Sequence, residues 1–167
     1  MQKPTTNIRT YFCIFGDDFP LDEFTRKIVI TPTETRTKGE IYTIGKTQHE
    51  SYTTSWTYEI DYQLTSDPTL QINELIDIFT NKVNIINHFQ KEFNLKCKIA
   101  VVLIFPETSG LFFDQKLIKF AYDTNSEYDI DIYRDEIKIE NKNASNDITE
   151  AFYFQFFAFS GTFTPST

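Results

Sequence analysis

The chain has 167 residues, of which 40% are hydrophobic and 24% are charged. These values are typical of a soluble globular protein, and they exclude a wholly disordered chain. Glycine (5) and proline (6) are scarce, which also excludes a collagen-like or linker-rich architecture, whereas aromatic residues reach 16%. Length and composition therefore predict a single aromatic-rich domain over residues 1–167.

The chain is acidic, with 24 acidic and 16 basic residues and a net charge of −8. Such a chain repels phosphate backbones and anionic lipids, so we expect no nucleic-acid partner and no membrane partner. A basic protein or a cation remains compatible with this charge. The segment 123–150 holds nine acidic against three basic residues and supplies −6 of the net charge. The simpler interpretation of this segment is a solvated surface that keeps the protein soluble.

The sequence also predicts a cytoplasmic location. The N-terminal residues after Lys3 contain no apolar run of the kind found in secretory signals. The longest aliphatic run, 99–105, is too short to span a bilayer. Cys13 and Cys97 lie in apolar runs, which favours buried free thiols over a disulfide framework.

In the first half of the chain, β-branched and aromatic residues predict a strand over 10–16, ending at Gly16. A short helix follows from Pro20 to Ile28. The threonine-rich stretch 31–54 predicts a loop with turns at Gly39 and Gly45 and a short strand over 41–44. The next strand, over 55–64, alternates strictly, which predicts one apolar face composed of Trp56, Tyr58, Ile60, Tyr62 and Leu64.

In the second half, helical spacing predicts one long helix over 68–94, then a central strand over 95–105 and a shorter helix over 114–122. A strand over 128–133 is expected to turn into a hairpin at 134–140, and a further strand is expected over 152–159. This order predicts an α+β fold, a two-layer sandwich of a mostly antiparallel sheet with about three helices packed on one face. The expected core comprises Trp56, Tyr58, Ile60, Ile76, Phe79, Val101 and Leu103.

Chemistry-bearing motifs are scarce in the sequence. Phosphate-binding glycine loops and a nucleophile elbow are missing, and His49 and His88 have no partner at metal-ligand spacing. We therefore expect no enzymatic activity and no cofactor. Asp17 and Asp18 open a helix, where carboxylates cap the backbone, and Asp129 and Asp131 alternate along a strand and so share a face. The same four carboxylates are the candidates for a Mg²⁺ or Ca²⁺ site.

Several short motifs, taken in order, resemble a bacterial family known as domain of unknown function 4279. They are the segments 16–18, 20–22, 30–33, 38–40, 55–56 and 128–133. The resemblance covers residues 9–134 and leaves 135–167 as a strand-rich aromatic C-terminal extension. It implies a small bacterial cytoplasmic domain, and some members of the family lie near polymorphic toxin genes as immunity proteins. The family offers no established catalytic residues.

The resemblance and the charge together lead to one main hypothesis, a non-enzymatic immunity protein that binds a basic cognate toxin through an acidic surface. The candidate contact residues are Asp123, Glu127, Tyr128, Asp129, Asp131, Tyr133, Asp135, Glu136 and Glu140. One alternative is a small metal-binding or ligand-binding domain, or an enzyme, that uses Asp17, Asp18, Asp129 and Asp131. The other is a housekeeping scaffold.

Overall fold

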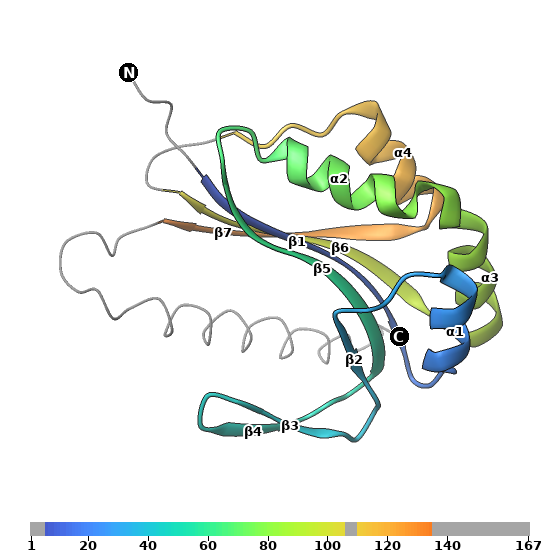
Figure 1. Cartoon of the computed structure of the whole chain (residues 1–167). Coiled ribbons are helices and arrows are strands. Elements are labelled where there is room, and N and C mark those ends of the chain that lie inside the picture. The colour runs from blue at the N-terminus through green and yellow to red at the C-terminus, as the bar shows by residue number, and fades with distance from the viewer. Residues whose placement is uncertain (1–5, 106–109, 135–167) are drawn as a thin grey trace, which may run out of the picture.

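A computed structural model describes residues 6–105 and 110–134 of the chain. Its main element is a five-stranded sheet in the order β2-β5-β1-β6-β7 (Figure 1). The central strand β1 (Thr6–Gly16) pairs antiparallel with β5 (Thr54–Thr65) and with β6 (Lys96–Phe105). The predicted hairpin partner and the predicted strand over 152–159 lie outside the described residues.

The two edge strands differ in direction. At one edge β2 (Glu34–Arg36) pairs antiparallel with β5, and at the other β7 (Ser126–Arg134) pairs parallel with β6. A second sheet is the hairpin of β3 (Ile41–Ile44) and β4 (Thr47–Glu50), which turns at Gly45 and projects beneath the main sheet (Figure 1). The turn and β3 were predicted. Strands β2 and β4 were not predicted, because both are short and polar.

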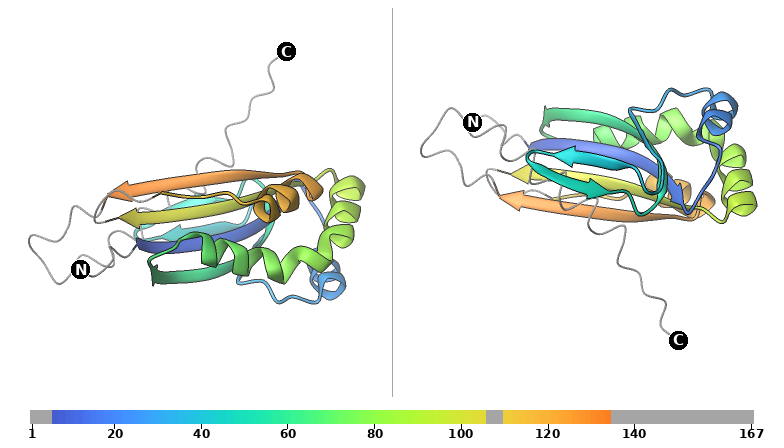
Figure 2. Two further views of the ribbon diagram at one scale, coloured as in Figure 1. Left: turned by 90° about the horizontal axis from the view of Figure 1, so that it is seen from above. Right: turned by 90° about the horizontal axis from the view of Figure 1, so that it is seen from below.

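The helices lie on one face of the main sheet (Figures 1 and 2). They are α1 (Leu21–Ile28), α2 (Thr69–Phe79), α3 (Val83–Phe93) and α4 (Gln115–Asp123). The architecture is therefore α+β with helices on one side of a mostly antiparallel sheet, as predicted. None of the helices in residues 6–105 and 110–134 has the length and apolar character needed to cross a membrane.

The predicted single helix over 68–94 is wrong, because a 3-10 turn over Thr80–Lys82 divides it into α2 and α3. The hydroxyl of Thr80 donates a hydrogen bond of 2.8 Å to the carbonyl of Ile76. A threonine that bonds back to the preceding turn in this way tends to bend a helix. The bend lets α3 leave the sheet surface and pack beside α1 (Figure 2).

The core lies between the sheet and the helices. Of its predicted members, Tyr58 is half-buried against the cluster, and the others are buried, namely Trp56, Ile60, Ile76, Phe79, Val101 and Leu103. Aromatic edge contacts connect strands to helices, as between Phe24 and Trp56, whose ring centroids lie 5.2 Å apart. The abundance of phenylalanine in the sequence therefore supplies the packing between the layers.

The predicted single apolar face of the strand over 55–64 is wrong in its second half. Thr10 lies opposite Ile60, but Ile8 lies opposite Gln63, so β5 carries one extra residue at this point. Such a β-bulge moves every later side chain to the other face. Tyr62 consequently packs against an apolar cluster on the face that carries no described helix, and Leu64 is exposed. We call this side the helix-free face.

Candidate binding surface

The predicted acidic residues of strand β7 lie on the helix-free face. Residues directly opposite one another in paired strands share a face of the sheet. Asp129 lies opposite Ala100, which lies opposite Tyr11 of the helix-free cluster, and Asp131 lies opposite Val102 of the same cluster. Glu127, Asp129, Asp131 and Tyr133 therefore project from one side of an edge strand. The prediction that Asp129 and Asp131 share a face is confirmed.

A lysine from the neighbouring strand lies among these acids. The Nζ atom of Lys98 is 2.9 Å from Oδ2 of Asp129, and the lysine side chain is only 14% exposed. Lys98 is directly opposite Glu127 in the register of β6 and β7. The aliphatic part of Lys98 is thus packed on the sheet while its ammonium group partly neutralises the row of acids.

Asp131 lies in an environment that disfavours its charged form. Partial burial raises the pKa of this carboxyl above its ordinary value, and the nearby charge of Asp129 raises it further, while Lys98 has the smaller opposite effect. A cationic group from outside would relieve this repulsion. The charged form of Asp131 would therefore be stabilised by a basic partner.

Other predicted contact residues lie away from this row. Tyr128 points to the helix side of β7, where its ring packs against Phe113 with centroids 4.7 Å apart and its hydroxyl donates to the carbonyl of Leu117 at 2.8 Å. Burial raises its pKa to about 12. Asp123 ends α4 and pairs with Lys119. Asp135, Glu136 and Glu140 lie outside the described residues.

The four carboxylates of the metal hypothesis do not meet. Asp17 follows the end of β1, where it forms an exposed ion pair with Lys38 at 2.6 Å, and Asp18 beside it is exposed. Asp129 lies in register with Tyr11 of β1, through Ala100 of β6. Tyr11 precedes Asp17 by six residues, which is about 20 Å along an extended strand, so the two pairs of acids lie far apart. Among the residues that the structure describes, no three His, Cys, Asp or Glu side chains gather as a metal ion would need.

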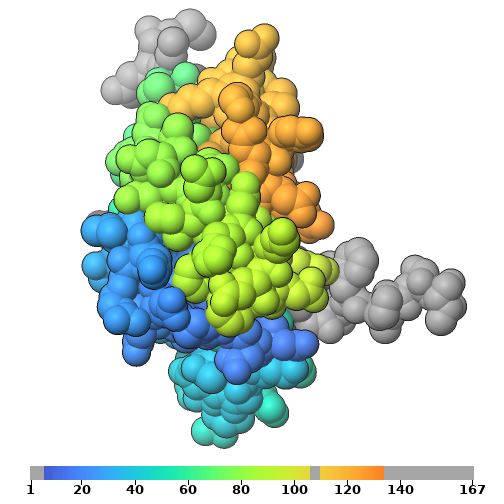
Figure 3. Space-filling view, turned by 90° about the vertical axis from the view of Figure 1, so that its right-hand side faces the viewer, coloured from blue at the N-terminus to red at the C-terminus, as the bar shows by residue number. Residues whose placement is uncertain are grey.

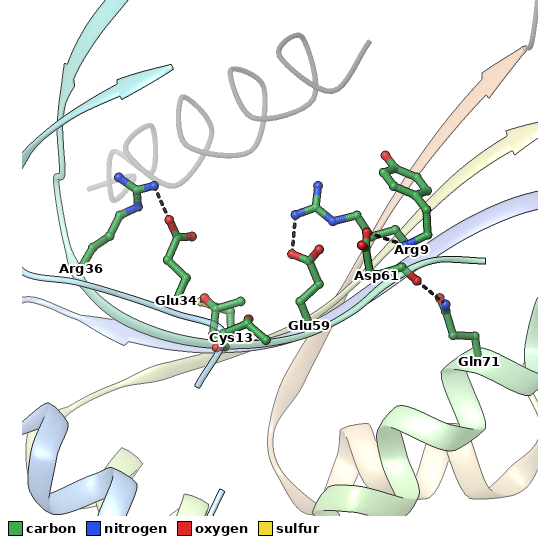
Figure 4. A network of polar contacts seen from close by, with 10 residues as sticks. Arg9, Cys13, Glu34, Arg36, Glu59, Asp61 and Gln71 are labelled. Carbon is green, nitrogen blue, oxygen red and sulfur yellow. Dashed lines mark hydrogen bonds and ion pairs between the residues drawn. The ribbon is translucent and has the colours of Figure 1, made fainter. Parts of the chain in front are cut away.

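The helix-free face also holds ion pairs that the sequence analysis missed. Arg9 pairs with Glu59, and Arg36 pairs with Glu34, on the same side of the sheet (Figure 4). The guanidinium of Arg9 lies 5.7 Å from the ring centroid of Tyr62, which the bulge brings to this face. Only the strand register reveals Glu59 as the partner of Arg9, whereas Arg36 and Glu34 lie two residues apart in β2 and so share a face of that strand.

Burial dominates the electrostatics around these pairs. It raises the pKa of Glu34, an effect that Arg36 partly opposes. It also raises the pKa of the Cys13 thiol to about 11, although the Thr57 hydroxyl donates a hydrogen bond of 3.4 Å to this sulfur. Cys13 and Cys97 are buried free thiols, as predicted. A thiol with a raised pKa is a poor nucleophile, so this face offers ionic and aromatic contacts rather than thiol chemistry.

Comparison with known proteins places the chain among relatives of undefined activity. A family model described as a domain of unknown function (DUF4279) matches residues 6–135. This range includes every described strand and helix, and it agrees with the resemblance seen in the sequence motifs. No curated protein matches the chain significantly, and no solved structure does so either.

Proposed function

Because the chain belongs to the domain of unknown function 4279 family, we propose that it is a cytoplasmic, non-enzymatic immunity protein that binds and neutralises a toxin with a basic surface. The observation that supports this proposal most is the row of Glu127, Asp129 and Asp131 on an edge strand. An edge strand is accessible to a partner in a way that central strands are not.

The net charge of −8 supports the same class of partner. Opposite charges on two proteins accelerate their encounter and disfavour wrong partners, and many toxins that attack nucleic acids are basic. A desolvated acid such as Asp131 adds to the effect, because its repulsion from Asp129 would be relieved in the complex. The partners we propose are therefore basic proteins, and neither nucleic acids nor membranes.

One observation favours the alternative of a small carboxylate-based cation site. Asp129 and Asp131 share a face, and the charge of Asp129 contributes to the raised pKa of Asp131. Two such carboxylates supply oxygen ligands of the kind that Mg²⁺ and Ca²⁺ prefer. Lys98 already occupies the position beside Asp129, which makes a protein partner the better proposal.

The proposal is tested by co-expression with the product of the gene immediately upstream, the position at which we expect the cognate toxin to be encoded. We expect the parent chain to protect cells, and a Glu127→Lys/Asp131→Lys variant to lose protection while keeping its fold, because Glu127 is exposed, Asp131 is only partly buried, and charges that reach solvent contribute little to stability. The matched control is Glu74→Lys/Glu92→Lys, which makes the same change in net charge at two exposed helix positions. The control should protect as the parent does.

Two results would contradict the proposal. If the parent chain gives no protection and does not bind the neighbouring gene product, the immunity function fails. If the β7 double variant protects as well as the parent, the acidic row is only a solubilising surface. The single variant Glu127→Lys, at an exposed position, guards against a misleading loss through misfolding.

A further inference from the structure

Strand β7 presents apolar side chains on the side opposite its acids. Ile130 is 36% exposed and Ile132 is 63% exposed, and both point to the side on which the helices lie. Within residues 6–105 and 110–134, β7 ends the sheet, and its outer edge pairs with no strand. An edge flanked by exposed isoleucines, and without a strand partner among the described residues, is a template for another strand.

Helix α4 extends this apolar surface. Ile118 and Tyr122 are four residues apart, so they share one flank of the helix, and they are 56% and 85% exposed. The opposite flank carries Lys116, which pairs with Asp77 of α2 at 2.7 Å. The exposed flank therefore faces away from α2. Figure 3 shows α4 and β7, in amber and orange, side by side on one flank of the molecule.

We define the β7 margin as the outer edge of β7 together with the side chains on its two sides. The helix side is apolar and carries Ile118, Tyr122, Ile130 and Ile132. The helix-free side is acidic and carries Glu127, Asp129 and Asp131. A strand added along this edge would send alternate side chains to the two sides. The complementary strand is one in which apolar and basic residues alternate.

We propose that the β7 margin binds an extended strand of a partner protein by strand addition, and that this strand alternates apolar and basic residues. Backbone hydrogen bonds along β7 supply affinity, and the two sides of the margin supply specificity. The inference deepens the proposed immunity function and rests on it only for the identity of the partner. It names the recognition mode and the chemistry of the recognised segment.

Charge argues against a second copy of this chain as the occupant. Two β7 strands paired edge to edge would bring two acidic rows onto one face of a continuous sheet. Like charges placed directly across a strand pair are destabilising. Basic side chains at the same positions would instead meet Glu127 and Asp131 with opposite charge.

The test uses a synthetic peptide of nine residues, the length of β7, in which Lys and Val alternate and both termini are blocked. The full chain is mixed with this peptide, and backbone hydrogen exchange and calorimetric affinity are measured. We expect slower exchange of amides in β7. Ile132→Lys should weaken binding about tenfold through lost apolar contact, and Ile41→Lys, at an isoleucine of similar exposure (58%) in β3, should leave it unchanged.

Peptides of altered pattern separate the contribution of apolar contact from that of charge. Alternating Lys and Ser keeps the charge but removes the apolar side, and alternating Glu and Val reverses the charge, so neither should protect β7. Absence of binding by the Lys–Val peptide, or binding that leaves β7 amides unprotected, overturns the inference. So does slow exchange of the outer β7 amides in the free chain, the result expected if the hairpin predicted at 134–140 occupies this edge. A concentration-dependent dimer that protects these amides also overturns it, because a second copy would then be the occupant.

The result is separable from the immunity function. If the Lys–Val peptide protects β7 but the neighbouring gene product does not bind, strand addition stands and the proposed function fails. If that product binds and β7 amides still exchange freely in the complex, the immunity function stands and strand addition fails.

Discussion

Asp131 and Asp17 carry the same carboxyl group in opposite electrostatic environments. Partial burial, with Asp129 nearby, raises the pKa of Asp131, whereas a hydrogen bond from Lys38 lowers the pKa of Asp17. A raised carboxyl pKa means that the ionised form opposes folding. The contribution of Asp131 to stability is therefore fully present below its ordinary pKa of 3.8 and is lost as the pH rises through its raised pKa in the folded protein.

The first prediction follows from the raised pKa of Asp131. At pH 7, Asp131→Asn should raise the melting temperature by a small amount, a few degrees at most, because it removes a charge that the fold disfavours. At pH 3 the two proteins should melt together, since Asp131 is then largely protonated. Asp17→Asn is the control of opposite sign: it should melt slightly below the parent at pH 7. A melting temperature of Asp131→Asn below that of the parent at pH 7 would contradict the assignment.

At the scale of elements, the sequence pattern does not predict the structure of strand β5 or of the helical run 69–93 in full. The alternation from Trp56 to Leu64 is unbroken in the sequence, yet the bulge opposite Arg9 moves Tyr62 to the other face. Periodicity along one strand contains no information about an extra residue relative to its partner. The helical run likewise keeps its apolar spacing across Thr80, and its bend depends on a side-chain bond that spacing does not reveal.

The elements that were predicted correctly have strong local signals. The acidic N-cap Asp114 receives a hydrogen bond of 2.9 Å from the backbone of Leu117 and begins α4 as expected. Strand β6 is a dense run of Ile and Val. Strand β2 lacks such a signal, and its residues Glu34 and Arg36 take their role from pairing with β5. Local chemistry thus predicted the elements, and long-range pairing decided which side chains share a face.

The second prediction concerns the contact between α2 and the sheet. The ring centroid of Phe79 lies 4.6 Å from that of Phe12 in β1 and 5.7 Å from that of Tyr58 in β5. Phe79→Ala should therefore reduce the free energy of unfolding by about 3–5 kcal/mol, through lost apolar burial and a residual cavity. Urea denaturation measures this change, with Glu74→Ala on the exposed face of α2 as the control. A loss below about 1 kcal/mol would mean that this side chain is not a central packing element.

For the molecule as a whole, the placement of the carboxylates determines which of them can act together. Asp17 and Asp18 lie beyond one end of β1, whereas Asp129 and Asp131 lie along the far edge of the sheet. Residue type alone groups these four acids, because the sequence does not place the ends of strands relative to one another. Its alternation correctly predicts that Asp129 and Asp131 share a face, but it does not reveal that Tyr128 faces the core or that Lys98 lies beside Asp129.

The last prediction tests whether the acids of β7 bind a metal ion. Adding MgCl₂ or CaCl₂ to about 5 mM should leave the melting temperature of the chain where NaCl of equal ionic strength leaves it, because a ligand that binds only the folded state would raise it. Asp131→Asn should respond to both salts as the parent does. Since Asp129 already pairs with Lys98, a cation would have to displace an ammonium group to gain a second carboxylate. A rise in melting temperature that is specific to one divalent ion and absent in Asp131→Asn would instead establish a cation site on β7. The acidic row would then bind a metal ion rather than a basic protein.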